Sequence, residues 1–443
     1  MQPGPMQPHR ETEGKPRRQV LAWAFYDWGN SAFATTVMAG FFPIVFKEYF
    51  SAGVEAAQST ARLGFANSAA GLAVAVAAPF LGAVADRASS KKLFLACFAA
   101  TGVLSTVGLS LVGMGSWVLA CTLYGLGLAG FLGGNVFYDS LLKRICSEGE
   151  TDRVSSLGYG LGYLGGGLLF ALNVWMLSSP SSFRMAGALD AARFSFVAVG
   201  VWWAVFTVPL LAFVREPALP GVRISDAITG GLAMLRSTMR EIARLRTLLL
   251  FLTAYWLYID AVDTIIVMAV DYGLSLGFDR TDLVSALLLV QFIGFPCAIA
   301  FGRLGGVVGT KRAIILALCV YLFVTLWGAF IETRGEFYLM AALIGTVQGG
   351  VQALSRSFYA RLVPTGKEAE FFGFYNMIGK FASIVGPALV ALTVLLARAA
   401  GAPGHTAPRF SIASIALLFI AGGAVLLLVD EERGSRERGI LEA

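Results

Sequence analysis

The long apolar segments of this chain differ in a regular way: every third one lacks acidic, basic and amide side chains. The twelve segments lie near residues 20–46, 63–85, 93–115, 117–140, 155–178, 194–213, 247–270, 281–302, 313–331, 337–360, 371–397 and 410–429. The third, sixth, ninth and twelfth contain no Asp, Glu, Lys, Arg, Asn, Gln or His, whereas each of the others contains at least one. A charge at the centre of a bilayer costs ~2.5–3.5 kcal/mol, so it should face the protein interior or a water-filled cavity. The pattern therefore separates helices with polar interior faces from helices that mostly contact lipid.

Length and composition predict that these segments cross a membrane. A helix of about 20 residues spans the ~30 Å hydrocarbon core of a bilayer. Of all residues, 57% are hydrophobic and only 14% are charged. We therefore expect an all-α integral membrane protein with twelve transmembrane helices. The first segment is too long for a signal peptide and is expected to remain as a span. A three-helix period repeated four times is typical of transporters built from three-helix repeats.

The distribution of Lys and Arg predicts the orientation. With the N-terminus in the cytoplasm, the inner loops hold about three times as many Lys and Arg as the outer loops. Both termini are therefore expected in the cytoplasm of a multi-pass protein of the cell (inner) membrane. The net charge is +6, but the basic residues are scattered over short loops, which argues against nucleic acid as a partner.

The cysteines and histidines do not indicate an enzyme. No two cysteines have the spacing of zinc ligands, and His9 and His405 fall in a tail and an outer loop. Without a His–acid or Cys–His pair, we expect no catalytic residues, no metal site and no cofactor. The five cysteines are expected to be free thiols: Cys97, Cys121, Cys146, Cys297 and Cys319.

The two parts of the chain repeat one another. Residues 82–92, between the second and third segments, align with residues 302–312, between the eighth and ninth. Two six-helix halves joined by the longest loop explain this repeat. In that loop, apolar residues recur every three or four positions opposite Arg236, Arg240 and Arg244, which predicts an amphipathic helix on the inner membrane surface. The alternative is a solvated helical linker. The expected tail, half, linker, half and tail are residues 1–19, 20–213, 214–246, 247–429 and 430–443.

Several sequence strings resemble a known family. The loop containing Gly82, Asp86, Arg87 and Lys91-Lys92 resembles the loop signature of the major facilitator superfamily, although Ser89-Ser90 stand where a glycine is usual. More specific strings resemble the branch that contains the fungal autophagy-related vacuolar amino-acid effluxer and many uncharacterised bacterial relatives. These strings are FYDWGNSAF (25–33), GNVFYDS (134–140), GYGLGYLGG (158–166), QALSRS (352–357) and FFGFY (371–375).

This resemblance implies a fold and a class of function. The fold has two pseudo-symmetric six-helix halves, with helices 1, 4, 7 and 10 around a central cavity and helices 3, 6, 9 and 12 outside. The function implied is secondary transport, with amino-acid export as one candidate. The seventh helix departs from the branch, because Ile259-Asp260-Ala261 replaces the expected Asn-Asp-Gly. The resemblance therefore does not fix the substrate.

Polar residues on these helices are the candidate substrate-binding or coupling residues. Residues four apart share a helix face, and those three apart roughly do so. By this spacing, Asn135 lies with Asp139, and Gln348, Gln352 and Arg356 form one stripe. Such a cavity suits a small polar or zwitterionic solute. The full set is Asp27, Asn30, Asn135, Asp139, Tyr255, Asp260, Asp263, Gln348, Gln352, Arg356 and Lys380.

Structural roles remain open for several of these residues. Asp139 and Arg356 are candidates for an ion pair between helices, and Lys380 is either a structural counter-charge or an anion contact. Amides in the second, fifth and eighth segments are expected to form interhelical hydrogen bonds rather than to bind a ligand. These amides are Asn67, Asn173 and Gln291.

Two functional expectations follow from the charged residues. Burial disfavours the ionised carboxylate, so Asp27 and the Asp260/Asp263 pair are candidate proton carriers, Asp27 first among them. Arg356 presents a planar fork suited to a carboxylate, with Asp263 or Asp260 opposite it for an amine.

A gate is expected at the cytoplasmic end of the second helix. There Asp86, followed by Arg87, should contact the start of the eleventh helix near Phe371-Phe372, as the family implies. The matching position in the second half is Gly306, so the latch should be one-sided.

The sequence therefore predicts a proton-coupled secondary transporter for a small polar solute, working as a monomer in the lipid bilayer. The alternative is a non-transporting membrane sensor or regulator with the same fold.

Overall fold

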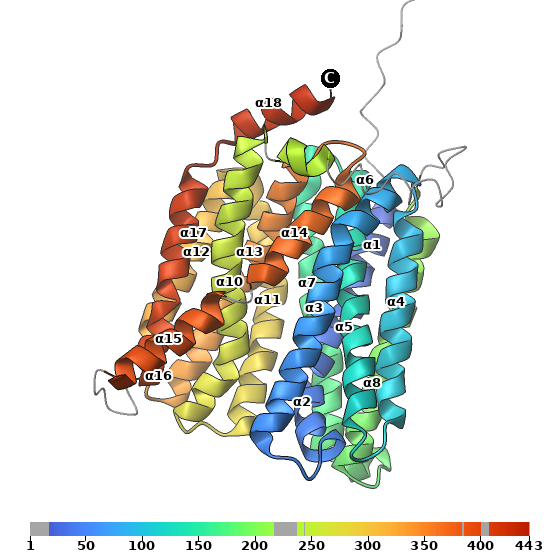
Figure 1. The fold of residues 1–443 in the computed structure, drawn as a ribbon, viewed down its shortest axis with the longest axis vertical. Helices are drawn as coiled ribbons and strands as arrows, with labels where there is room; N and C mark the ends of the chain where they lie inside the picture. Colours follow the sequence, from blue (N-terminus) through green and yellow to red (C-terminus); the bar gives the residue numbers. More distant parts are fainter. Residues whose placement is uncertain (1–16, 217–236, 243, 383–384, 400–406, 443) are drawn as a thin grey trace, which may run out of the picture.

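The computed structural model describes residues 17–216, 237–242, 244–382, 385–399 and 407–442 (Figure 1). In these ranges the chain is a helical bundle without strands. Twelve of its helical spans are long and apolar enough to cross a membrane. The predicted all-α fold with twelve transmembrane helices is confirmed.

The first six spans form the N-terminal half. The first begins with α1 (Arg17–Ala32) and continues through the π-helical η1 (Phe33–Phe41), the short α2 (Phe42–Val45) and η2 (Phe46–Phe50). The other five are α3 (Ala56–Arg87), α4 (Lys91–Gly108), α5 (Trp117–Ser140), α7 (Thr151–Ser178) and α8 (Ala188–Phe213). Between α5 and α7 lies the short α6 (Leu142–Ile145).

The last six spans form the C-terminal half. They comprise α10 (Arg246–Ser275), α11 (Arg280–Val308), α12 (Thr310–Gly328), α13 (Arg334–Leu362), α14 (Glu368–Ala382) with α15 (Val385–Ala399), and α16 (Ala407–Ser414) with α17 (Ala416–Leu427). After them, α18 (Glu431–Glu442) lies across one end of the bundle (Figure 1).

Most of the predicted amphipathic linker helix lies outside the described residues. In its described end, Ile242 and Leu245 are buried, whereas Arg240 and Arg244 are exposed. The apolar side of this end therefore packs on the protein, where Ile242 and Met239 border a groove with α10 and α14.

The two halves contact each other along α3 with α14, and along α7 with α11 and α13. The end of α3, the loop to α4, α6 and α18 lie at the top of the bundle in Figure 1. We call this end the termini face and the opposite end the far face. The described parts of the two halves thus meet mainly through α3 and α7 of the N-terminal half.

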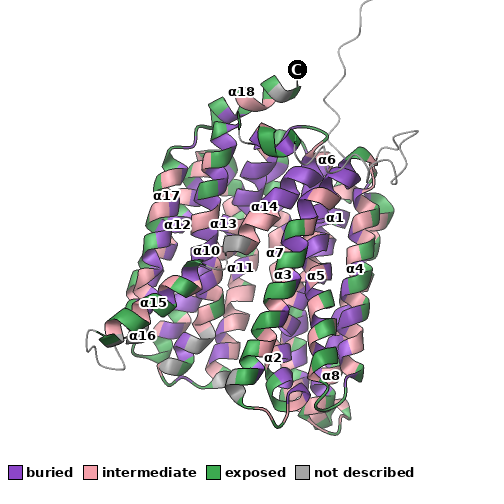
Figure 2. Ribbon diagram, viewed as in Figure 1, coloured by how far each residue is buried: buried purple, intermediate pink, exposed green. Residues whose placement is uncertain are grey.

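The spans without polar side chains lie at the periphery. Large apolar residues there are more than half exposed, among them Leu104 on α4, Val208 on α8, Phe323 on α12 and Ile420 on α17. In Figure 2, buried residues concentrate where helices meet, and exposed ones lie on outward helical faces. The sequence-based expectation that these spans mostly contact lipid fits this arrangement.

Close helix packing in the N-terminal half depends on glycine. A Cβ added at Gly130 of α5 would lie 2.5 Å from Gly102 N and 2.6 Å from both Gly102 Cα and Phe98 O of α4. Backbone atoms cannot yield as a flexible side chain can, so α4 and α5 pack this closely only with glycine at position 130.

We predict that Gly130→Ala lowers the thermal unfolding temperature, because overpacking at such a contact costs roughly 1–3 kcal/mol. Gly71→Ala on α3 is the matched control, since an added Cβ there meets nothing within 4 Å. Fluorescence-detected unfolding in detergent compares the two. Equal unfolding temperatures for both variants would contradict this packing.

Candidate functional site

A cavity of about 430 Å³ lies between the two halves. It extends from Asp139 and Arg356, towards the termini face, to Leu283 and Phe337 in the first turns of α11 and α13 at the far face. Its walls come from the first, fourth, fifth, seventh, eighth, tenth and eleventh spans. Among the described residues, none from the third, sixth, ninth or twelfth span lines it. The sequence therefore separated the peripheral helices correctly and placed Lys380 of span 11 at the site, whereas the contributions of spans 5 and 8 were not predicted.

Asp27 lines the cavity from α1 and is only 8% exposed. Its Oδ1 accepts a hydrogen bond from Ser31 Oγ at 2.8 Å. A Cβ at Gly162 on α7 would lie 2.9 Å from this Oδ1, so the glycine leaves room for the carboxylate. No ion pair involves Asp27 within the described part of the chain. The residue is thus an acid in the cavity wall without a cationic partner in contact.

Asn30 does not line the cavity, contrary to expectation. Its Nδ2 donates to Asn135 Oδ1 at 2.6 Å, and the residue is 1% exposed. A separation of three residues turns Asn30 about 60° away from Asp27 on the helix, which is enough to point it at α5. Asn30 therefore orients Asn135, which does line the cavity.

Arg356 joins the two halves at the end of the cavity nearest the termini face. From α13 its Nη1 pairs with Asp139 Oδ1 of α5 at 2.9 Å. Its Nε donates to Ser155 Oγ at 2.9 Å and its Nη2 to Ser155 O at 2.8 Å, both on α7. The guanidinium also lies 4.3 Å from the ring centre of Tyr159. All three guanidinium nitrogens are engaged, so the structural ion pair describes Arg356 in this conformation better than an open carboxylate anchor.

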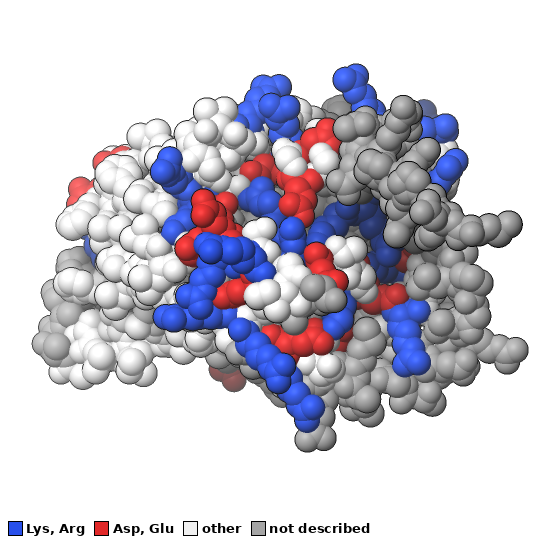
Figure 3. Space-filling view, turned by 90° about the horizontal axis from the view of Figure 1, so that it is seen from above, with Lys and Arg blue, Asp and Glu red and all other residues white. Residues whose placement is uncertain are grey.

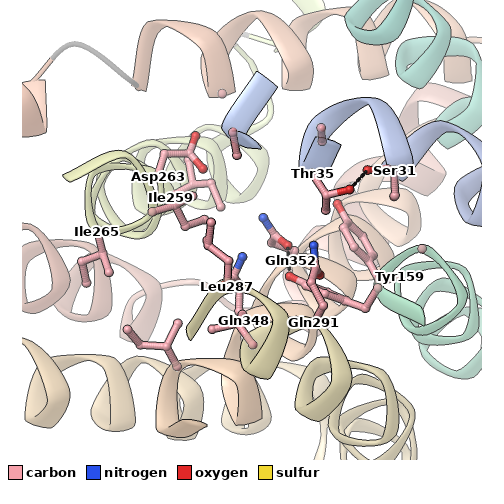
Figure 4. Close-up of a pocket in the computed structure, with 18 of the residues that line it drawn as sticks. Ser31, Thr35, Tyr159, Ile259, Asp263, Ile265, Leu287, Gln291, Gln348 and Gln352 are labelled. Carbon is pink, nitrogen blue, oxygen red and sulfur yellow. Dashed lines mark hydrogen bonds between the residues drawn. The ribbon is translucent and has the colours of Figure 1, made fainter. Parts of the chain in front are cut away.

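The two acids of α10 have different environments. Asp260 is outside the cavity lining, 1% exposed, and both its carboxylate oxygens accept from Gly386 N at 3.0 Å. Gly386 is the second residue of α15, where backbone N–H groups lack partners within the helix. Asp260 therefore caps α15, and its placement in the cavity was wrong. Asp263 does line the cavity (Figure 4).

Amides and tyrosines form the middle of the cavity wall. Figure 4 shows Gln291, Gln348 and Gln352 converging from α11 and α13. The hydroxyl of Tyr163 donates to Gln352 Oε1 at 3.1 Å. Gln291, expected to form an interhelical hydrogen bond, lines the cavity instead, and its single amide in an apolar span did not distinguish it from Asn67 and Asn173. Asn67, bonded to Tyr124, and Asn173, bonded to Thr36, do link helices as expected.

The eleventh span contributes the cavity's second cation. Lys380, on α14 with Asn376 one turn before it, lines the cavity. Tyr255, also predicted, lines it from α10, with its ring stacked on Tyr375 at a centroid distance of 4.2 Å.

Asp86 contacts the start of α14 as anticipated. Its Oδ2 accepts from Glu370 N at 2.9 Å, and its Oδ1 pairs with Lys91 Nζ at 2.7 Å. Lys91 is completely buried and also pairs with Glu368 at 2.6 Å, so one lysine bridges both halves. Arg87 is exposed, and no ion pair joins it to the described residues. The ion pair between Lys91 and Glu368 was not predicted, although the two acids in the first turn of α14, Glu368 and Glu370, were a signal for it.

A second cluster shows that the one-sided latch was wrong. Asp152, in the first turn of α7, accepts from Thr310 Oγ1 at 2.7 Å and pairs with Arg361 at 3.2 Å. Ser357 also donates to it. The second half has Gly306 where the first half has an acid. The acid of this second contact is Asp152, which the first half supplies. In Figure 3, acidic and basic side chains gather over the centre of the termini face.

The described residues bear on the sequence-based expectations for metal sites and cysteines. No group of three or more His, Cys, Asp and Glu there could hold a metal ion, and the five cysteines are free.

Sequence comparison finds relatives over most of the chain. Residues 63–439 match the family described as "Vacuole effluxer Atg22 like". The chain is 36% identical over 424 residues to the uncharacterized MFS-type transporter YxiO of Bacillus subtilis (strain 168), covering 94% of this chain and 95% of that protein. It is 28% identical over 326 residues to autophagy-related protein 22-2 of Aspergillus oryzae, covering 64% of this chain and 51% of that protein. The chain thus spans about half the length of this fungal relative.

Structural comparison finds the same fold. The human organic anion transporter MFSD10 (TETRAN) superposes with a TM-score of 0.71 at 15% identity, covering 95% of this chain and 100% of that one. The proton:xylose symporter XylE superposes with a TM-score of 0.69 at 13% identity, covering 96% and 98%. At these identities the likeness concerns the fold alone.

We predict that Asp260→Ala lowers the unfolding temperature, because losing a helix N-cap costs roughly 0.5–2 kcal/mol. Asp263→Ala, one turn away but facing the cavity, should cost less stability, because it removes no hydrogen bond to a backbone N–H. Thermal unfolding of both purified variants decides the matter. A larger loss for Asp263→Ala would contradict the capping role of Asp260.

We predict that Asp86→Asn weakens the contact with α14 and shifts the population towards states open at the termini face, by at most about 2 kcal/mol. Labelling of single cysteines on α14, in a background without the native cysteines, measures this shift. The control is Arg87→Gln, which changes an exposed neighbour. If labelling at the termini face is the same in Asp86→Asn as in the control, Asp86 does not act as a latch.

Proposed function

This chain belongs to the vacuole effluxer Atg22-like family of the major facilitator superfamily, and we propose that it is a secondary active transporter of a small polar solute. The observation that carries the proposal is the polar cavity between two halves whose contacts at the termini face are ionic. A solute bound there would be released on either side as the halves rock about it, which is alternating access.

The chemistry of the cavity supports a small polar solute, amino acids included. Three acids and two bases line it: Asp27, Asp139, Asp263, Arg356 and Lys380. Glutamine amides and tyrosine hydroxyls line the same cavity, among them those of Gln291, Gln348, Gln352 and Tyr159 (Figure 4). Such groups supply both donors and acceptors for a solute that carries opposite charges. A substrate without polar groups would leave these buried side chains unpaired, which costs free energy.

The arrangement of contacts supports an outward-facing state. Ionic contacts between the halves at the termini face involve Asp86, Lys91 and Glu368 on one side, and Asp152 and Arg361 on the other. The excess of Lys and Arg in the loops of this face favours placing it in the cytoplasm of a cell-membrane protein. The moving halves are then residues 20–213 and 247–429, joined by a cytoplasmic linker at 214–246, and the working unit is a monomer.

Flux measured in proteoliposomes tests this proposal. Purified protein should carry solutes from a panel of amino acids and other small polar compounds faster than empty liposomes do. A sensor or regulator with a transporter fold would carry none of them.

We predict proton coupling through Asp27, whose carboxylate lies in the cavity wall without a cation in contact. Asp27→Asn cannot bind or release a proton, so flux driven by a pH gradient should fall to background while solute exchange persists. Asp260→Asn is the matched control, since that carboxylate caps a helix outside the cavity. Undiminished pH-driven flux in Asp27→Asn would reject Asp27 as the carrier.

A further inference from the structure

Two cations line the cavity, and only one of them is already held by hydrogen bonds. The Arg356 guanidinium donates to Asp139 and Ser155 through all three nitrogens. For Lys380 the described residues provide neither a hydrogen bond nor an ion pair, although its side chain is only partly exposed. A partly buried ammonium group without a partner carries a large desolvation cost. Lys380 therefore has the unused binding capacity that Arg356 lacks.

The acid that acts on Lys380 electrostatically is Asp263 on the facing helix α10. The two groups are not in contact, since no ion pair is formed between them. Asp263 thus lowers the cost of burying the lysine without occupying its donors. A solute anion that reaches Lys380 would compete with Asp263 for the same positive charge.

The neighbours of Lys380 suit a carboxylate. Asn376 lies one turn earlier on α14 and lines the cavity. Its Nδ2 donates to Phe372 O at 3.0 Å, and the same amide also interacts with the Asp139 carboxylate, so a solute carboxylate would compete with Asp139 for this donor. The stacked rings of Tyr255 and Tyr375 line the same part of the cavity. A cation, an amide donor and an aromatic wall are therefore grouped at one place.

The charge of the cavity lining favours a singly charged anion over a doubly charged one. Three acids and two bases give the lining a net charge of −1 when all are ionised. Because this net charge is negative, the lining repels a doubly charged phosphate about twice as strongly as a single carboxylate, which the one free lysine can pair.

Building on the proposed transport function, we propose that Lys380 and Asn376 form the subsite for a single carboxylate of the solute. Asp263 balances the charge of Lys380 while the cavity is empty. The solute class is then a small monocarboxylate, and the carboxylate is recognised by the C-terminal half rather than by Arg356 at the interface between halves.

Matched solutes test the subsite in proteoliposomes and by thermal stabilisation. The probes are pairs that differ only in a carboxylate or a carboxamide, namely lactate with lactamide and alanine with alaninamide. For the transported pair, wild-type protein should prefer the carboxylate by at least tenfold in half-maximal concentration. Lys380→Met should remove this preference, and Lys380→Arg, which keeps the charge, should retain part of it.

Asp263→Asn separates a binding role of Lys380 from a structural one. If Lys380 binds the carboxylate, removing its competitor should lower the half-maximal concentration of the carboxylate several-fold. If Lys380 only balances Asp263, the same change should destabilise the protein without tighter binding. This arm also decides the question should Lys380→Met fail to fold.

The outcomes separate the two proposals. Transport that continues in Lys380→Met with an unchanged carboxylate preference would overturn the subsite and leave the transport function standing. A wild-type preference for the amides would do the same. Absence of flux for every solute of the wider panel would overturn the transport function, and the subsite with it.

Discussion

The ion pair between Arg356 and Asp139 is the interaction on which the closed state depends. A buried guanidinium must be paired, and its partners here belong to the other half of the molecule. Separating the halves at the termini face breaks the pair and leaves two buried charges, at a cost of roughly 3–5 kcal/mol unless something compensates. In the transport mechanism that we propose, solute or proton binding beside this pair supplies that compensation, because Asp27 lines the same cavity.

The two clusters at the termini face extend the same principle. Lys91 lies between Asp86 and Glu368, and Asp152 lies between Thr310 and Arg361. In each cluster the acid or base of one half is satisfied by a helix end of the other. The halves are thus joined by several contacts that are strong when dry and weak when hydrated. Such contacts favour two discrete states, closed or open, over a gradual opening.

The sequence predicted what depends on composition along single helices. Polar side chains are costly in lipid, so the four spans without them could be placed outside the bundle, as α4, α8, α12 and α17 are. It could not predict helix rotation or partners distant in sequence. Asp260 and Asp263 differ by one turn, and only the packing of α10 against α15 decides which faces the cavity. Likewise, nothing near Gly306 in the sequence indicated that Asp152 would contact Thr310 of the other half.

Paired distances across both faces test alternating access most directly. Spin labels at Arg87 and Arg303 report the termini face, and labels at Glu55 and Thr281 report the far face, because all four positions are exposed near the ends of α3 and α11. Pulsed dipolar spectroscopy in lipid should show two populations for each pair. When solute or pH shifts the populations, the termini-face distance should lengthen as the far-face distance shortens. One unchanging distance for each pair, in a preparation that transports solute, would contradict the mechanism.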